Sequence, residues 1–174
     1  TISRAKVTVD YPASFMLIAS MNPCPCGYYN HPEKECVCGP GVVKRYVAKI
    51  SGPLLDRIDL HVEVTPVSYD ELTTTQRPKL TSAEIRQRVL RARDIQAARF
   101  KDLRDVYCNA QMPSRMVREV CALDSSGLTL LKTSMERLQL SARAYDRILK
   151  VARTAADLAG SADIRIEDLA EAIH

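Results

Sequence analysis

The chain has 174 residues, of which 46% are hydrophobic and 26% charged, with a formal net charge of +4. This is enough apolar material for a packed interior, which excludes a disordered chain. No run of about 18 uncharged apolar residues occurs, so no membrane span is expected. Six cysteines without a secretory leader favour a reducing, cytoplasmic compartment. Because the sequence begins at Thr1 and not at Met, we expect a piece of a longer protein.

The first 65 residues have the pattern of a small α/β layer. Phe15–Ala19 is a short apolar run that predicts a buried strand, and residues 60–64 alternate apolar and polar side chains like a second strand. A short helix is expected between them, from Pro40 through Lys49. Too few strands are present to close a sheet, so either the missing strands lie upstream or the fold is unusually small.

Residues 66–79 are polar and predict a linker, and residues 80–174 beyond it have helical periodicity. Thr81 and Glu84 form a capping box that opens the first helix. Its predicted apolar stripe is Ile85, Val89 and Ala92, and its other face is nearly all arginine.

Four more helices are expected in the same region. The second begins at Pro113 and ends near Leu123, and the fifth begins near Arg165 and is cut off at His174. The third carries its apolar positions at Leu128, Leu131, Met135 and Leu138. The fourth is capped by Ser141, stopped by Gly160 and lined on one face by Ala144, Ile148, Val151, Ala155 and Leu158.

Four of the six cysteines form two CxCG units: Cys24, Cys26, Cys36 and Cys38. Four thiolates would supply a closed tetrahedral zinc site with no position left for water. The CxC spacing is less common than CxxC, so a loop tightened by four reduced thiols, or redox chemistry, stays open. His31 lies between the pairs and is a possible substitute for one cysteine, whereas Cys108 and Cys121 are expected to be small core residues.

Three further polar residues are ambiguous from the pattern alone. Asn22 follows the first predicted strand, where it either orients a water or a phosphate or caps the next turn. Arg57 lies between Asp56 and Asp59 and is most simply their structural partner. Arg143 lies near the amino end of a helix, where the helix dipole disfavours a cation, so it either awaits an anion such as phosphate or faces solvent.

Residues 81–104 carry seven basic and three acidic side chains. The face formed by Arg86, Arg88, Arg91 and Arg93 either neutralises nucleic-acid phosphates or is simply solvated. The chain has no GxxxxGK[ST] motif and no apolar strand ending in Asp-Glu. By itself it is therefore not expected to cradle and hydrolyse a nucleotide.

Three motifs together resemble one known family: MNPCPCG from Met21, SGPLLDRIDLHVEV from Ser51 and LSARAYDRILKVARTAADLAGS from Leu140. They resemble the magnesium-chelatase-like AAA+ proteins of bacteria, the YifB/ComM group, over nearly the whole chain. The resemblance implies a mainly α fold with a small α/β part: the end of a AAA+ core in residues 1–65, then a helical lid domain in residues 80–174. It also implies that an amino-terminal Lon-protease-like domain and the Walker half of the ATPase are missing.

The resemblance assigns roles to the ambiguous residues. Asn22 matches sensor 1, which helps to place the attacking water, and Arg57 matches the arginine finger that one subunit extends into its neighbour's nucleotide site. Arg143 matches the sensor 2 arginine on the lid. Because phosphoryl transfer depends on positive charge around the γ-phosphate, an arginine supplied in trans ties hydrolysis to assembly.

The resemblance implies that the intact protein binds ATP and Mg, hydrolyses ATP as a ring, hexameric by the family pattern, and moves along DNA in branch migration. The cysteine loop, an insertion between the sensor strand and the helix leading to the finger, would stiffen that region or contact a neighbour or DNA.

Two rival functions stay open. One is a true magnesium-chelatase subunit that inserts Mg into a porphyrin, although the CPCG loop is a YifB/ComM feature. The other is a non-enzymatic zinc and helix module that binds nucleic acid through its arginine face.

Overall fold

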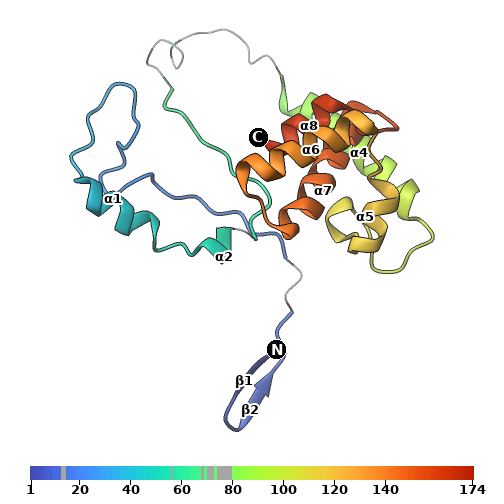
Figure 1. Ribbon diagram of the computed structural model, residues 1–174, viewed down its shortest axis with the longest axis horizontal. Coiled ribbons are helices and arrows are strands. Elements are labelled where there is room, and N and C mark those ends of the chain that lie inside the picture. Colours follow the sequence, from blue (N-terminus) through green and yellow to red (C-terminus); the bar gives the residue numbers. More distant parts are fainter. Residues whose placement is uncertain (13–14, 56, 68, 70–72, 74–79) are drawn as a thin grey trace. The chain divides into compact units, whose positions relative to one another are not determined.

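The computed structural model describes residues 1–12, 15–55, 57–67, 69, 73 and 80–174. These residues form two compact units, residues 1–51 and residues 52–174 (Figure 1). Most of the linker predicted over residues 66–79 lies outside the described residues, as does Asp56. Within the described part of the chain, no helix is long and apolar enough to cross a membrane.

The first unit begins with a hairpin and ends in a short helix. Strands β1 (Ile2–Arg4) and β2 (Val7–Val9) pair antiparallel, with Ile2 opposite Val9. All of the strand residues are exposed, so the hairpin has no core of its own. Helix α1 (Pro40–Val47) has its proline in the first turn, where the missing N–H costs nothing, and it confirms the short helix expected after Pro40.

Neither of the two predicted strands forms in this structure. The segments 15–19 and 60–64 lie outside regular secondary structure, and Met16 and Val64 are 83% and 86% exposed. A strand needs neighbouring strands to pair its backbone and another layer to cover its apolar side chains. The described residues provide neither, so the prediction of these strands is wrong for this chain.

The second unit is helical, as the sequence predicted. After the single turn α2 (Gly52–Leu55), its elements are α4 (Ser82–Phe100), the 3₁₀ turn η1 (Asn109–Gln111), α5 (Ser114–Val120), α6 (Ser125–Leu138), α7 (Ala142–Ala159) and α8 (Ile166–Ile173). The fold is therefore mainly α with a small two-stranded sheet. The five helices predicted after the linker are all present.

Local sequence sets the ends of these helices. The hydroxyl of Thr81 accepts from the backbone N–H of Glu84 at 3.3 Å, and the Glu84 carboxylate accepts from the N–H of Thr81 at 2.7 Å. This confirms the predicted capping box. Ser141 caps α7 by accepting from the N–H of Ala144 at 3.3 Å, and Gly160 ends it with a φ of 71°. That left-handed conformation favours glycine.

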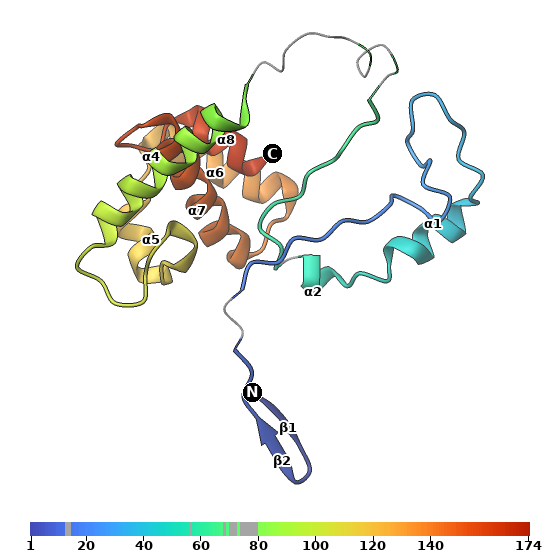
Figure 2. The same cartoon turned by 180° about the vertical axis from the view of Figure 1, so that it is seen from behind.

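Helix α7 is the central element of the bundle. It packs against α4, α5, α8 and η1, and Figure 2 shows the same helices gathered around it from behind. The core side chains come from α4 to α8 and from the loop after η1, and include Phe100, Met112, Val117, Leu131, Leu149 and Leu169.

The buried faces differ from the predicted stripes. On α4, Ala92 is buried, but Ile85 and Val89 are 48% and 45% exposed, and burial continues instead at Gln96 and Phe100. The bundle therefore covers only the carboxyl-terminal half of α4. The same correction applies to α6, where Leu131 is buried but Leu128 and Leu138 are about half exposed.

Helix α7 is buried over a broader and more polar face than predicted. Of the five positions in the predicted apolar stripe, only Ile148 is buried. Because α7 is central, two neighbouring rows of side chains are covered instead: Ile148, Leu149, Ala152, Arg153, Ala156 and Asp157.

Candidate functional site

Four cysteine sulfurs of the first unit lie together. The ligand atoms of Cys24, Cys26, Cys36 and Cys38 are all within 4.8 Å of one another. The Sγ atom of Cys24 is 3.3 Å from that of Cys26 and 3.7 Å from that of Cys36. Two thiolates bound to one tetrahedral zinc, at about 2.3 Å each, lie about 3.8 Å apart. The donor set and its spacing therefore fit a closed zinc site.

Short turns bring the two CxCG units into this arrangement. The backbone N–H of Gly27 donates to the carbonyl of Cys24 at 3.0 Å, and Gly27 has a φ of 83°, which favours glycine. The second unit leads directly into α1, because Gly39 is the N-cap of that helix. Cys24 is fully buried, although the loop around it is largely exposed.

The thiols are not electrostatically equivalent. The backbone N–H of Tyr28 lowers the pKa of Cys26 to about 6, against the effect of burial. The backbone of Cys38 acts in the same direction on Cys36, but burial and the thiols of Cys26 and Cys24 together outweigh it and raise the pKa of Cys36 to about 12. Four thiolates this close need a cation to share their charge, which is what a structural metal supplies.

His31 is not part of the cluster. Its Nδ1 accepts hydrogen bonds from the backbone N–H groups of Glu33 and Lys34, both at 3.1 Å. Its ring packs edge-on against Tyr28, with the centroids 5.6 Å apart. Among the described residues, the four-ligand group consists of cysteines alone, so the alternative in which His31 replaces a cysteine is wrong.

The residue proposed as sensor 1 lies just before this loop. Asn22 is exposed and outside regular structure, two residues before Cys24. It follows the segment 15–19, which is not a strand here, so no strand end presents its amide. Its role as a sensor stays a prediction.

The turn that carries Arg57 is built by local hydrogen bonds. The backbone N–H groups of Arg57 and Ile58 donate to the carbonyls of Leu54 and Leu55, at 2.9 Å and 3.0 Å. Arg57 is exposed, and its Nη1 donates to the carbonyl of Pro53 at 2.6 Å. This bond uses one of the five N–H donors of the guanidinium and neutralises none of its charge.

Asp59, two residues after Arg57, pairs with a residue of α7. The Nε of Arg147 lies 3.0 Å from a carboxylate oxygen of Asp59, and the two side chains are 24% and 61% exposed. Arg147 lies one turn after Arg143 on the helix. The sequence-based alternative in which Asp59 is the partner of Arg57 is therefore not the arrangement of the structure. Sequence reasoning missed Arg147, although its spacing of four residues from Arg143 was a usable signal.

The remaining predicted site residues are exposed. Arg143 is the second residue of α7, where the helix dipole disfavours its charge. All four arginines of the predicted face are exposed: Arg86, Arg88, Arg91 and Arg93. At about 100° per residue, Arg86 and Arg93 lie on one side of α4, and Arg88 and Arg91 lie on nearly the opposite side, so the four do not form one continuous face. A nucleic-acid role for these arginines stays a prediction.

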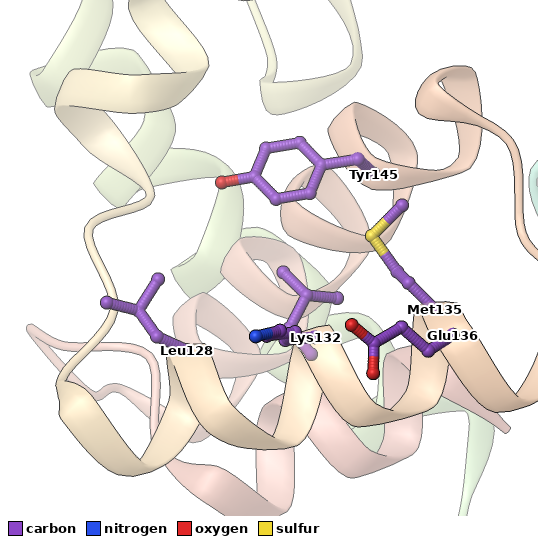
Figure 3. A pocket seen from close by; sticks show the side chains of 6 residues that line it. Leu128, Lys132, Met135, Glu136 and Tyr145 are labelled. Atoms are coloured by element: carbon purple, nitrogen blue, oxygen red, sulfur yellow. The ribbon is translucent and has the colours of Figure 1, made fainter.

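Helices α6 and α7 also border an open apolar pocket of about 470 Å³. Figure 3 shows Leu128, Lys132, Met135 and Glu136 along α6, with Tyr145 of α7 on the other side. None of the residues proposed above for nucleotide or metal binding lines it.

The family comparison places these features in one class of protein. The family described as "Magnesium chelatase, subunit ChlI C-terminal" matches residues 79–174, and "Magnesium chelatase, subunit ChlI" matches residues 1–72. The class is that of AAA+-type ATPases. Within it, the chain belongs to the magnesium-chelatase-like YifB/ComM family, which confirms the resemblance of the three motifs.

Similar proteins are found in several bacteria. The chain is 40% identical to competence protein ComM of Haemophilus influenzae over 172 residues, which cover 99% of this chain and 32% of that protein. It is 39% identical to YifB of Escherichia coli, again over 99% of this chain and 33% of the relative. An uncharacterized protein of Mycobacterium tuberculosis is 34% identical with the same coverage. The chain thus spans about a third of the length of these relatives.

Proposed function

We propose that this chain is the carboxyl-terminal part of a AAA+ ATPase that hydrolyses ATP as a ring and moves along branched DNA. In this proposal residues 1–65 end the α/β core, residues 66–79 are a linker and residues 80–174 form the lid. The observation that carries the proposal is the environment of Arg57: it is exposed, its described contacts include only a neutral carbonyl, and Asp59, two residues further on, pairs with Arg147.

A guanidinium in this state suits an arginine finger. Its bond to the carbonyl of Pro53 is a neutral-acceptor bond, which is weaker than a bond to a phosphate oxygen. A γ-phosphate in a neighbouring subunit would therefore displace it. Positive charge delivered in this way stabilises the transition state of phosphoryl transfer and makes hydrolysis depend on assembly.

Asn22 and Arg143 complete the proposed set. The Asn22 amide would orient the attacking water, and Arg143 would contact the γ-phosphate from the lid. The exposed position of Arg143 at the start of α7 supports this, because the helix end offers no favourable partner for the cation. ATP and Mg²⁺ would be held chiefly by Walker residues outside this chain, and Mg²⁺ would neutralise charge on the phosphates.

We propose that the cysteine cluster holds zinc as a structural ion. Cys24, Cys26, Cys36 and Cys38 would occupy all four positions and leave none for water, so no catalytic step passes through the metal. Bound zinc would stiffen the loop between Asn22 and α1. This would limit the motion of the segment that carries the sensor.

DNA is proposed as the partner because the chain resembles a competence protein and because α4 carries four exposed arginines. Between Arg86 and Arg93, only Ala92 is buried. Charges placed in this way neutralise phosphates at little cost in folding stability.

A second candidate is a magnesium-chelatase subunit that uses the same ATPase to drive Mg insertion into a porphyrin. The descriptions of both matching families support it. The two candidates differ in what accelerates ATP hydrolysis: branched DNA for the motor, and a porphyrin-binding partner for the chelatase.

The decisive experiment measures ATP hydrolysis by the full-length protein with and without branched DNA. Arg57→Ala protein is mixed with wild type in increasing ratio, and Arg115→Ala, whose side chain is 93% exposed, is the matched control. Stimulation by DNA together with poisoning of mixed rings by Arg57→Ala alone is the expected result. Poisoning without DNA stimulation would favour the chelatase. Full activity of pure Arg57→Ala would overturn the finger assignment.

The non-enzymatic alternative predicts a different result. DNA binding by this chain alone would then be salt-sensitive, would be lost on charge reversal at Arg88 and Arg91, and would be indifferent to Arg57→Ala and Arg143→Ala. Fluorescence anisotropy with labelled branched DNA distinguishes these outcomes.

A further inference from the structure

We propose that Arg147 is a positioning residue that holds the arginine-finger turn on α7. The proposal rests on the proposed function, because it concerns the placement of Arg57. Its basis is the ion pair between Arg147 and Asp59, whose two residues are far apart in the sequence and are joined at 3.0 Å.

Different interactions fix the shape of the turn and its position. Local backbone hydrogen bonds fix its shape, since the N–H groups of Arg57 and Ile58 donate within the turn. Leu55 and Ile58 are half-buried, whereas Arg57 between them is exposed. These bonds do not determine where the turn lies relative to the bundle. The ion pair of Arg147 with Asp59 does, because one of its residues belongs to α7 and the other to the turn.

The contribution of this ion pair to folding stability is too small to explain its role. Asp59 is 61% exposed, and exposed ion pairs contribute little to the stability of a fold. Placement is more demanding, because a shift of about 1 Å in a group that acts in a transition state costs on the order of a hundredfold in rate. The pair therefore matters for the location of Arg57 more than for the stability of the fold.

Its place on α7 links it to the proposed sensor 2. Arg143 and Arg147 are four residues apart and lie on one face of the helix, one turn from each other. A rotation or tilt of α7 in response to nucleotide would move Arg143 and, through Asp59, the finger turn together. In this way the lid of one subunit would adjust the finger that it offers to the next.

The test is a double-mutant cycle in the full-length protein. ATP turnover is measured for Arg147→Met, Asp59→Asn and the double variant, with Arg147→Lys as the conservative replacement. Arg115→Met, in the exposed pair of Arg115 with Glu119, is the matched control. We expect each single variant to lower kcat by about tenfold or more with little change in KM. The double variant should be no worse than either single one, and lysine should restore part of the rate.

The same variants separate this inference from the proposed function. Multiplicative losses in the double variant would show that the two residues act independently and would overturn the inference. Normal turnover of Arg147→Met, with Arg57→Ala inactive, would also overturn it and would leave the finger intact. Normal turnover of Arg57→Ala would overturn the proposed function itself. Should Arg147→Met fail to fold, Asp59→Asn on the exposed side of the pair decides between these outcomes.

Discussion

Arg99 of α4 and Asp157 of α7 are joined by two parallel hydrogen bonds, at 2.7 Å and 2.5 Å, although they are 58 residues apart. The side chain of Asp157 is fully buried, and its carboxylate also accepts from Asn109 at 2.8 Å and from Arg153 at 3.1 Å. Among the described residues, no buried side-chain N or O atom lacks a partner. The carboxylate thus ties three elements of the lid together.

Arg153 extends this network to the next connection. Its two terminal nitrogens donate to the carbonyls of Ser161 and Ala162, at 2.6 Å and 2.7 Å, in the loop between α7 and α8. A network around a buried carboxylate is costly to disrupt, because removal of one charged partner leaves the other buried charge unpaired.

The first prediction follows from that cost. Asp157→Ala should lower the free energy of unfolding by about 3 to 5 kcal/mol, since it leaves the buried guanidinium of Arg153 without its carboxylate. Urea unfolding of this chain followed by circular dichroism measures it. Glu119→Gln, on an exposed side chain, should change the value by less than about 0.5 kcal/mol. Equal effects of the two substitutions would contradict the network as a source of stability.

The second prediction concerns pH. The hydrogen bond from Arg165 lowers the pKa of Asp168 below its usual 3.8, against the effect of burial. A carboxyl group with a lowered folded-state pKa adds stability above its unfolded-state pKa and loses it as the pH falls through the folded-state value. Unfolding free energy should therefore be steady above about pH 5 and fall below pH 4. Asp168→Asn should be less stable at pH 7 and show a flatter acid limb in urea titrations at several pH values.

The sequence predicted the helices well because their signals are local. Thr81 with Glu84, and Ser141 with Gly160, are capping residues whose effect depends only on near neighbours. The cysteine cluster was also predictable, because both CxCG units lie within one loop. The strand at Phe15–Ala19 failed for the opposite reason: its pattern requires partners that the described residues do not supply.

The faces of the helices and the polar contacts were harder to predict. Whether Ile85 is covered depends on where the bundle ends, and periodicity does not contain that information. Arg99 with Asp157, and Arg147 with Asp59, are pairs across long stretches of sequence. Each residue alone is an ordinary charged side chain, so only the tertiary structure identifies its partner.

The third prediction tests the metal site. Cys36→Ser removes one of four soft ligands, so this chain should lose zinc on dialysis and its amino-terminal unit should become more susceptible to proteolysis. Zinc content per chain, measured by atomic spectroscopy, should fall from about one to near zero. Cys108→Ser, outside the cluster, should keep the metal. Retention of zinc by Cys36→Ser would contradict the four-cysteine assignment.

The last prediction compares two helix ends in the lid. Gly160 ends α7 with a φ of 71°, and nothing lies within 4 Å of the place where a Cβ would be, so Gly160→Ala suffers from backbone conformation alone. It should cost about 1 kcal/mol. Gln139 ends α6 in the same left-handed region, with a φ of 51°, and Gln139→Gly should gain about 0.5 to 1 kcal/mol. Urea denaturation of both variants measures the two changes. The prediction requires the two changes in unfolding free energy to have opposite signs, because a general effect of altering loop residues would change both values in the same direction.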